Sequence, residues 1–217
     1  MKAVQLRDPN ARPVIMWDID GVLADFALGF TELANSLYPS IPVHGTNIQK
    51  FWQFTGQSPA WTKEKETACW KEIQKSDNFW YNLASLLVRA DQLAMGRLAK
   101  VFDFQYVTGR FGEDSRNQTT NWLMTMGVPR PFGVTLTGSQ SSMNKGAIAK
   151  RFRARFAIDD APVYLEEIDK NGPEDLVLFR RRTKYNEPVE GSLMPGIPVN
   201  SVEEFCEEVL ERWNSNG

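Results

Sequence analysis

Two aspartates follow a short apolar run in the stretch VIMWDIDGVLADF, residues 14–26. Asp18 and Asp20 are one residue apart, so their side chains point to the same side of an extended backbone. Two neighbouring carboxylates can divide the work of catalysis, one as a nucleophile and the other as an acid and base. Taken alone, a D-x-D motif fits a turn with a helix cap equally well.

Other segments also carry reactive side chains at the ends of apolar runs. Thr108 ends FQYVT, Asp159 and Asp160 end RFAIDD, and Lys145 begins a helical pattern in SSMNKGAIAK. Ligands of open parallel sheets bind beyond the carboxyl ends of the strands. Together with the first two aspartates, this edge would hold four crowded carboxylates, which repel one another unless a cation joins them. Ligands that are all oxygens favour Mg²⁺, so we expect a magnesium site.

Each of these residues also has an ordinary structural interpretation. The paired aspartates before Ala161 and Pro162 could cap the next helix. Thr108 could be the last residue of a strand, and Lys145 a solvated surface charge. What favours a functional site is their combination, because each residue stands at its own boundary between a strand and a helix.

The segments that must position these residues follow an α/β pattern. Strands are predicted at residues 14–18, 104–108, 133–136, 156–158 and 176–179, with helical patterns between them. This alternation predicts a doubly wound parallel sheet. Ser115 and Gln118 have the spacing of a capping box at the start of one helix.

A long insertion interrupts the pattern between the first two strands. It contains the aromatic residues Phe51, Trp52, Phe54, Trp61, Trp70, Phe79, Trp80 and Tyr81. We expect a mostly helical cap at residues 31–85, inserted into a core formed by residues 1–30 and 86–217. Most of the rings should form a small core of the cap, and a few exposed ones could stack on a planar ligand.

The composition excludes several classes of protein. The chain has 217 residues, 42% of them hydrophobic and 24% charged, as in soluble globular proteins. Its net charge of -2 gives no general attraction to nucleic acid or to acidic membranes. Cys69 and Cys206 match no metal-ligand spacing and do not suggest a disulfide framework. His44 is the single histidine, which excludes mechanisms that need two.

No signal peptide and no membrane span are expected. The first residues, MKAVQLRDPNARPV, lack the apolar stretch of a signal peptide. No apolar run approaches the roughly 20 residues that a membrane span needs. We therefore expect a cytoplasmic protein without a membrane partner.

The motifs DIDGV, VTGR, Lys145 and AIDD together resemble the haloacid dehalogenase superfamily of aspartate-nucleophile phosphatases, over residues 13–182. Within it, WDIDGVLADF followed by an aromatic insertion with DNFWYNL resembles the 5'(3')-deoxyribonucleotidases. LVLFRRRTKYN is similar to the segment after their last acidic motif. The resemblance implies a Rossmann-like core with an inserted cap, and Mg²⁺-dependent hydrolysis of (deoxy)nucleoside monophosphates. A homodimer is compatible with it.

The resemblance also implies a role for each acidic residue. Asp18 would attack phosphorus and form an aspartyl phosphate. Asp20 would protonate the leaving oxygen and later activate water. Mg²⁺ would be held by Asp18, the backbone carbonyl of Asp20 and Asp160, with Asp159 acting through water.

The same resemblance implies a set of substrate contacts. Thr108 and Lys145 would hold phosphoryl oxygens, and Gly21 would let the backbone turn close to the phosphate. Phe26, eight residues after Asp18, is the first candidate for contact with the sugar or base. The full set of substrate-binding candidates is Phe26, Phe79, Trp80, Thr108, Gly109, Arg110 and Lys145.

One motif departs from the deoxyribonucleotidase pattern. Thr108 is followed by Gly109 and Arg110 instead of serine, and TGR resembles polynucleotide 3'-phosphatase domains. Arg110 could fork onto a second phosphate, or it could pair with Glu113 or Asp114 in its own loop, the simpler interpretation.

Two alternative functions therefore stay open beside the mononucleotide phosphatase. An aromatic roof favours a small substrate over a nucleic-acid end, which places the polynucleotide phosphatase second. A nucleotide-binding module without catalysis is the third alternative. The presence of all the acidic residues speaks against it, since a binding protein needs no acid and base at Asp20.

Overall fold

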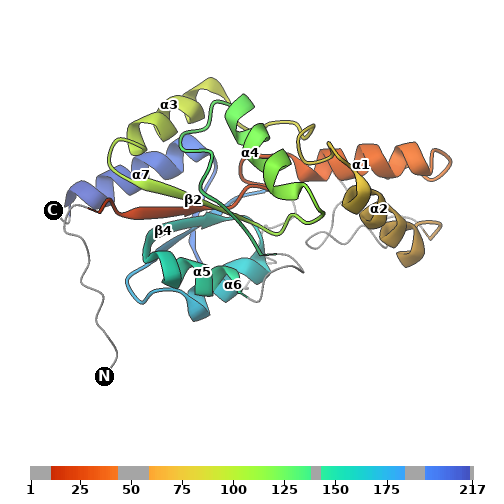
Figure 1. The fold of residues 1–217 in the computed structure, drawn as a ribbon. Helices are drawn as coiled ribbons and strands as arrows, with labels where there is room; N and C mark the ends of the chain where they lie inside the picture. The colour runs from red at the N-terminus through yellow and green to blue at the C-terminus, as the bar shows by residue number, and fades with distance from the viewer. Residues whose placement is uncertain (1–10, 44–58, 138–142, 184–193, 216–217) are drawn as a thin grey trace.

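A computed structural model describes residues 11–43, 59–137, 143–183 and 194–215 (Figure 1). His44 and the aromatic residues Phe51, Trp52 and Phe54 lie outside these ranges, as does the middle of the expected cap. The Lys184–Asn186 end of the LVLFRRRTKYN segment lies outside them too. Every described helix is too short or too polar to traverse a lipid bilayer.

Six parallel strands form one sheet in the order β3-β2-β1-β4-β5-β6. The strands are β1 (Val14–Trp17), β2 (Asp103–Thr108), β3 (Val134–Leu136), β4 (Ala154–Asp159), β5 (Val177–Arg181) and β6 (Ile197–Val199). The predicted doubly wound α/β fold is confirmed. β6 has no counterpart among the predicted strands, because three residues that include a proline are too short to show a strand pattern.

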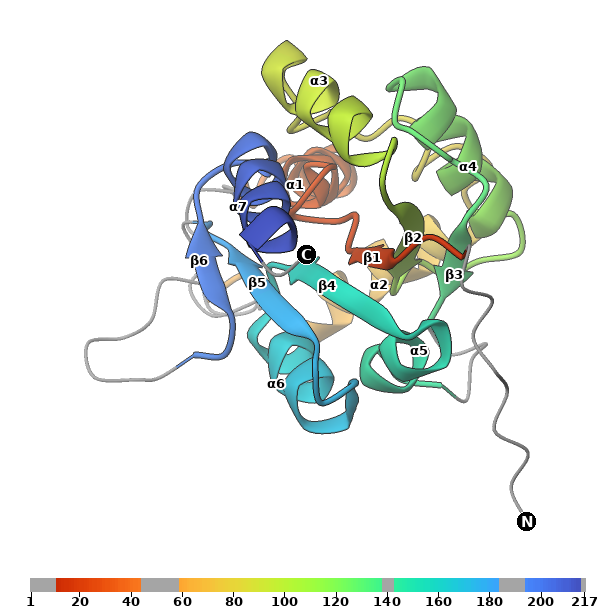
Figure 2. The same ribbon diagram turned by 90° about the vertical axis from the view of Figure 1, so that its left-hand side faces the viewer.

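Helices cover both faces of the sheet, as Figures 1 and 2 show. One face carries α3 (Arg89–Leu98), α4 (Ser115–Thr125) and α7 (Val202–Ser215), and the other carries α5 (Lys145–Phe152) and α6 (Pro162–Asn171). Two helices, α1 (Phe26–Leu37) and α2 (Lys63–Lys75), project beyond the edge of the sheet at the right of Figure 1. The described part of the predicted insertion contains the end of α1 and the whole of α2, and α1 begins five residues before the expected boundary at residue 31.

The first strand is buried on both faces, which explains its unbroken apolar sequence. Ile15 and Trp17 face the layer of α3 and α7, while Met16 belongs to the apolar cluster under α5 and α6. The Trp17 ring packs against Phe104 and Phe205 at centroid distances of 5.3 and 4.8 Å. These contacts hold the end of β1, and thus Asp18, at the centre of the sheet edge.

Two backbone hydrogen bonds pair the turn after β1 with residues 84–86, which run antiparallel to it. The N–H of Asp25 donates to the carbonyl of Ala84, and the N–H of Leu86 donates to the carbonyl of Leu23, both at 2.8 Å. The base of the projecting helices is thereby bonded directly to the turn that follows β1.

The predicted capping box of α4 is wrong. The Ser115 hydroxyl donates to the carbonyl of Gly112 at 2.9 Å. The Gln118 side chain accepts from the N–H of Trp80 at 3.0 Å and donates to the carbonyl of Ser76 at 2.9 Å. Tertiary contacts thus use the polar groups that local capping would otherwise have used.

Candidate active site

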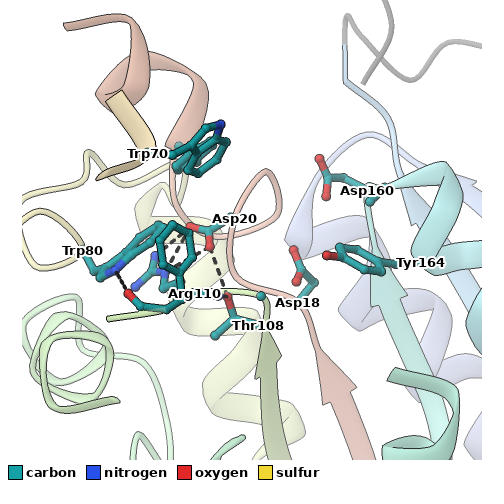
Figure 3. Close-up of a pocket in the computed structure, with 12 residues that line it drawn as sticks. Asp18, Asp20, Trp70, Trp80, Thr108, Arg110, Asp160 and Tyr164 are labelled. Carbon is teal, nitrogen blue, oxygen red and sulfur yellow. Dashed lines mark hydrogen bonds and ion pairs between the residues drawn. The ribbon is translucent and has the colours of Figure 1, made fainter. Parts of the chain in front are cut away.

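The carboxyl ends of β1, β2 and β4 bring the predicted acidic residues together (Figure 3). The N–H of Asp18 donates to the carbonyl of Ile158 at 3.0 Å, which extends the β1–β4 ladder by one residue. A tight turn follows, in which Gly21 has a φ of +87° and donates to the carbonyl of Ala24 at 2.8 Å. A side chain at Gly21 would be strained in this conformation, so the turn needs glycine.

Lys145 lies in the middle of the acidic residues. Its Nζ donates to Oδ1 of Asp18 at 2.5 Å and to Oδ2 of Asp159 at 2.7 Å, and it lies 4.0 Å from the centroid of the Tyr164 ring. Burial alone would lower the pKa of Lys145, but the two carboxylates outweigh it and the pKa lies above its ordinary value. Lys145 is therefore a fixed positive charge.

The local sequence explains how Lys145 reaches this place. As predicted, it begins helix α5, whose N-cap is Asn144, an acceptor for the N–H of Ala147 at 2.7 Å. A Cβ at Gly146 would lie 2.5 Å from the carbonyl oxygen of Glu167, so only glycine lets α5 approach α6 this closely. The Glu167 carboxylate also accepts from the N–H of Lys145 at 3.2 Å.

Three buried carboxylates could hold a metal ion. Oxygens of Asp18, Asp159 and Asp160 all lie within 4.8 Å of one another. Asp159 is otherwise engaged, since Oδ2 accepts from Lys145 and Oδ1 accepts from the N–H of Ala161 at 2.9 Å. Because Asp18 also accepts from Lys145, the expectation that Asp18 and Asp160 contact the ion directly and Asp159 through water stays a prediction.

The electrostatics of the cluster favour a divalent cation. Burial raises the pKa of Asp18 well above its ordinary value, and although Lys145 opposes the rise, the neighbouring aspartates add to it. The ion pairs described at the carboxylates of the site come from Lys145 and Arg110, which leaves negative charge in excess. Buried oxygen ligands with excess negative charge fit Mg²⁺.

Mg²⁺ should therefore stabilise the protein measurably. At a free concentration of a hundred times Kd, a ligand specific for the folded state adds about 2.7 kcal/mol. For a domain of this size we expect a rise in Tm of roughly 5–10 °C. Asp160→Asn should abolish most of the rise, whereas Asp169→Asn, at an exposed position of α6, should retain it. If thermal unfolding showed the same Mg²⁺-induced rise in Tm for both variants, Asp160 would not be a ligand of the metal.

Arg110 occupies a place that neither interpretation of its sequence anticipated. Its Nε donates to both carboxylate oxygens of Asp20 at 3.1 and 3.0 Å, and Nη2 donates to Oδ1 at 2.8 Å. The expectation that it pairs with Glu113 or Asp114 is wrong, because Asp20 attracts the guanidinium into the interior. Thr108 also donates its hydroxyl to Asp20, at 3.1 Å.

A pocket of about 190 Å³ opens above these residues. It is lined by Asp18, Asp20, Phe26, Trp70, Trp80, Thr108, Gly109, Arg110, Phe111, Asp160, Ala161 and Tyr164. In Figure 3, Asp20 and Arg110 lie on one side of Asp18, and Asp160 and Tyr164 lie on the other. The pocket thus contains the proposed nucleophile and acid, with aromatic side chains at its edges.

The aromatic candidates differ in their access to the pocket. Phe26 stacks on Trp70 and on Trp80, at centroid distances of 5.5 and 5.8 Å and interplanar angles of 15° and 22°. The ring is therefore buried among aromatic neighbours, although Phe26 still borders the pocket. Phe79 packs edge-on against Phe26 and Trp80. Among the described residues, it is not one of those that line the pocket.

Tyr164 borders the candidate site but was not among the residues predicted from the sequence. It lies in the first turn of α6, borders the pocket and places its ring over Lys145. Burial raises the pKa of its hydroxyl, which therefore stays protonated and can donate a hydrogen bond. A tyrosine within a helical pattern carries no signal of such a role, so only its position after the paired aspartates could have indicated it.

Comparison with known proteins identifies the fold. No family model matches the sequence, and no curated protein matches it significantly. Among solved structures, it is similar to a predicted phosphoglycolate phosphatase from Haemophilus somnus, with 13% identity, a TM-score of 0.62, and coverage of 91% of this chain and 98% of that one.

Two further structures show bound ions. A HAD family hydrolase from Deinococcus radiodurans with bound phosphate and sodium has 14% identity and a TM-score of 0.56, over 92% of this chain and 96% of the other. A HAD-hydrolase from Bacillus subtilis bound to magnesium has 13% identity and a TM-score of 0.56, over 92% and 99%. The chain therefore has the Rossmann-like fold of the haloacid dehalogenase hydrolases.

Proposed function

We propose that the chain is a Mg²⁺-dependent phosphatase of the haloacid dehalogenase superfamily that hydrolyses (deoxy)nucleoside monophosphates. The observation that carries the phosphatase assignment is the buried group at the ends of β1 and β4. There Asp18 is bonded to Lys145 beside Asp159 and Asp160, and Asp20 lies at the border of the same pocket. A fixed cation and a metal site around one buried carboxylate suit a phosphate ester.

In the proposed reaction, Asp18 attacks phosphorus and the bond to the leaving oxygen breaks, while Asp20 gives that oxygen a proton. Asp20 then takes a proton from water, which attacks the aspartyl phosphate and releases inorganic phosphate and free Asp18. Lys145 holds Asp18 in place and offsets negative charge on the phosphoryl group. A bound Mg²⁺ supplies further charge neutralisation when present.

The shape of the pocket supports a small substrate. Its volume of about 190 Å³ is below the range of roughly 300–1,000 Å³ that is usual for ligand pockets. The aromatic side chains at its edge suit a planar group such as a nucleobase. The guanidinium of Arg110 is engaged by Asp20, which weakens the case for a second phosphate there and thus for a nucleic-acid end.

A phosphate-release screen with Mg²⁺ tests the substrate class. We expect deoxynucleoside monophosphates to be hydrolysed at least roughly tenfold faster than DNA with a 3'-phosphate, and ribonucleotides to be slower than their deoxy forms. Sugar phosphates and p-nitrophenyl phosphate are the controls for general phosphatase activity. A higher kcat/KM for the DNA 3'-phosphate would identify a polynucleotide phosphatase, and binding of nucleotides without release of phosphate would identify a binding module.

A further inference from the structure

Every guanidinium nitrogen of Arg110 already donates a hydrogen bond within the protein. Nε and Nη2 donate to Asp20, and Nη1 donates to the hydroxyl of Thr119 at 3.2 Å. Although Arg110 borders the pocket, its side chain is 0% exposed. A phosphate group could reach it only by displacing Asp20, so Arg110 belongs to the wall behind the carboxylate.

Two tryptophan rings lie within cation–π distance of this guanidinium. Its Cζ lies 5.2 Å from the centroid of the Trp80 ring and 5.7 Å from that of Trp122. Trp80 is itself anchored, because its Nε1 donates to the carbonyl of Phe111 at 2.9 Å. An arginine this close to two indoles gains cation–π attraction and loses freedom to rotate. The fork toward Asp20 is therefore preorganised.

The same stack reaches the projecting helices. Trp80 packs against Phe26 of α1, and Phe26 packs against Trp70 of α2. A continuous series of contacts thus runs from Trp70 of α2 through Phe26 and Trp80 to Arg110. A shift of α2 relative to the sheet would be transmitted through these rings to the guanidinium.

We propose that Arg110 is a positioning residue that holds the carboxylate of Asp20 at the leaving-group side of the pocket, and that Trp80 ties this position to α1 and α2. The inference rests on the proposed phosphatase function and deepens it. Arg110 acts through Asp20 and makes no contact with the substrate. Its loss should impair every phosphate ester, in contrast to the selective loss on nucleic-acid ends that binding of a second phosphate would produce.

The dependence on leaving group provides a specific test. An alkoxide leaving group needs a proton from Asp20, whereas p-nitrophenolate leaves well without one. In single-turnover experiments with the Mg²⁺-loaded protein, Arg110→Lys should slow cleavage of an alkyl phosphate by roughly 100-fold. It should slow the release of p-nitrophenolate by less than roughly tenfold. The lysine keeps the charge but cannot fork onto both oxygens. KM should change little.

A double substitution distinguishes action through Asp20 from direct substrate binding. Adding Arg110→Lys to Asp20→Asn should cost less than about threefold beyond Asp20→Asn alone, because residues that act as a unit are not additive. The proposal would be overturned if the effects of Asp20→Asn and Arg110→Lys multiplied in the double variant. A raised KM with unchanged kcat in Arg110→Lys would overturn it too. Wild-type-like activity of Asp20→Asn would overturn the proposed reaction itself, which is a separate result.

Two further variants control for folding. Thr119→Val removes the acceptor of Nη1 but leaves the three hydrogen bonds from Arg110 to Asp20 possible, so it should give the same leaving-group dependence with a smaller effect. Arg97→Lys, in an exposed ion pair with Glu207, should match the wild type in every assay. Thermal unfolding shows which variants are folded. If a folded Thr119→Val and a folded Arg110→Lys slowed both esters equally, the positioning role would be excluded.

Discussion

Asp18→Asn is expected to reduce phosphate release by about 10⁴-fold or more, which is roughly 5.5 kcal/mol in the barrier at about 1.4 kcal/mol per tenfold. The amide has nearly the shape of the carboxylate but cannot attack phosphorus. Burial raises the pKa of Asp18, and Lys145 keeps Asp159 as its partner when the charge of Asp18 is removed, so the substitution should not destabilise the fold. Without metal, Tm should be unchanged or higher. Phosphate release and thermal unfolding on the same preparation measure both effects.

The matched control is Asp169→Asn, the same chemical change at an exposed position of α6. It should retain wild-type turnover and Tm. Mass spectrometry should verify that the asparagine introduced in the Asp18→Asn variant has not deamidated to aspartate. A verified, folded Asp18→Asn protein with wild-type-like turnover would end the aspartyl-phosphate hypothesis.

Among the substitutions proposed for this protein, Lys145→Met should cause the largest loss of stability. Methionine keeps an apolar stem of similar length, but Asp18 and Asp159 lose the cation to which both are bonded. Removing one partner of a buried ion pair costs about 3–5 kcal/mol, because the other charge is left buried and uncompensated. Urea unfolding without metal should show this decrease in the free energy of unfolding, and Mg²⁺ should restore part of it.

Lys150→Met is the control for this substitution, since Lys150 lies on the same helix but is exposed. Its effect should stay within about 0.5 kcal/mol. Adding Asp18→Asn to Lys145→Met should recover stability, because it removes one of the unpaired charges. Equal losses for Lys145→Met and Lys150→Met would contradict the buried charge cluster.

Much of the geometry of the candidate active site follows from local sequence and simple topology. Apolar runs that end in Asp18, Thr108 and Asp159 specify strands, and parallel strands bring their carboxyl ends to one edge. Lys145 needed only a helix that begins at the same edge. For these residues the chain order and the α/β alternation were sufficient.

The partners of Arg110 and Phe26 needed the folded structure. Arg110 has Glu113 and Asp114 as local candidates, yet it pairs with Asp20, 90 residues away. A buried guanidinium needs an acceptor in the interior, and residues 113 and 114 lie at a helix start near solvent. Phe26 was expected to contact the sugar or base of a ligand, but its stacking on Trp70 and Trp80, which come from two other segments, could not be predicted from its own segment.

The sequence by itself determined the fold class and which polar residues meet at the edge of the sheet, because strand direction and residue order are local properties. Only the tertiary structure decided which carboxylate each cation joins, how Trp70, Phe26 and Trp80 stack, and that Tyr164 borders the pocket. Those outcomes depend on competition among distant side chains for space, hydrogen bonds and charge in the interior. No short stretch of sequence contains all of the competitors.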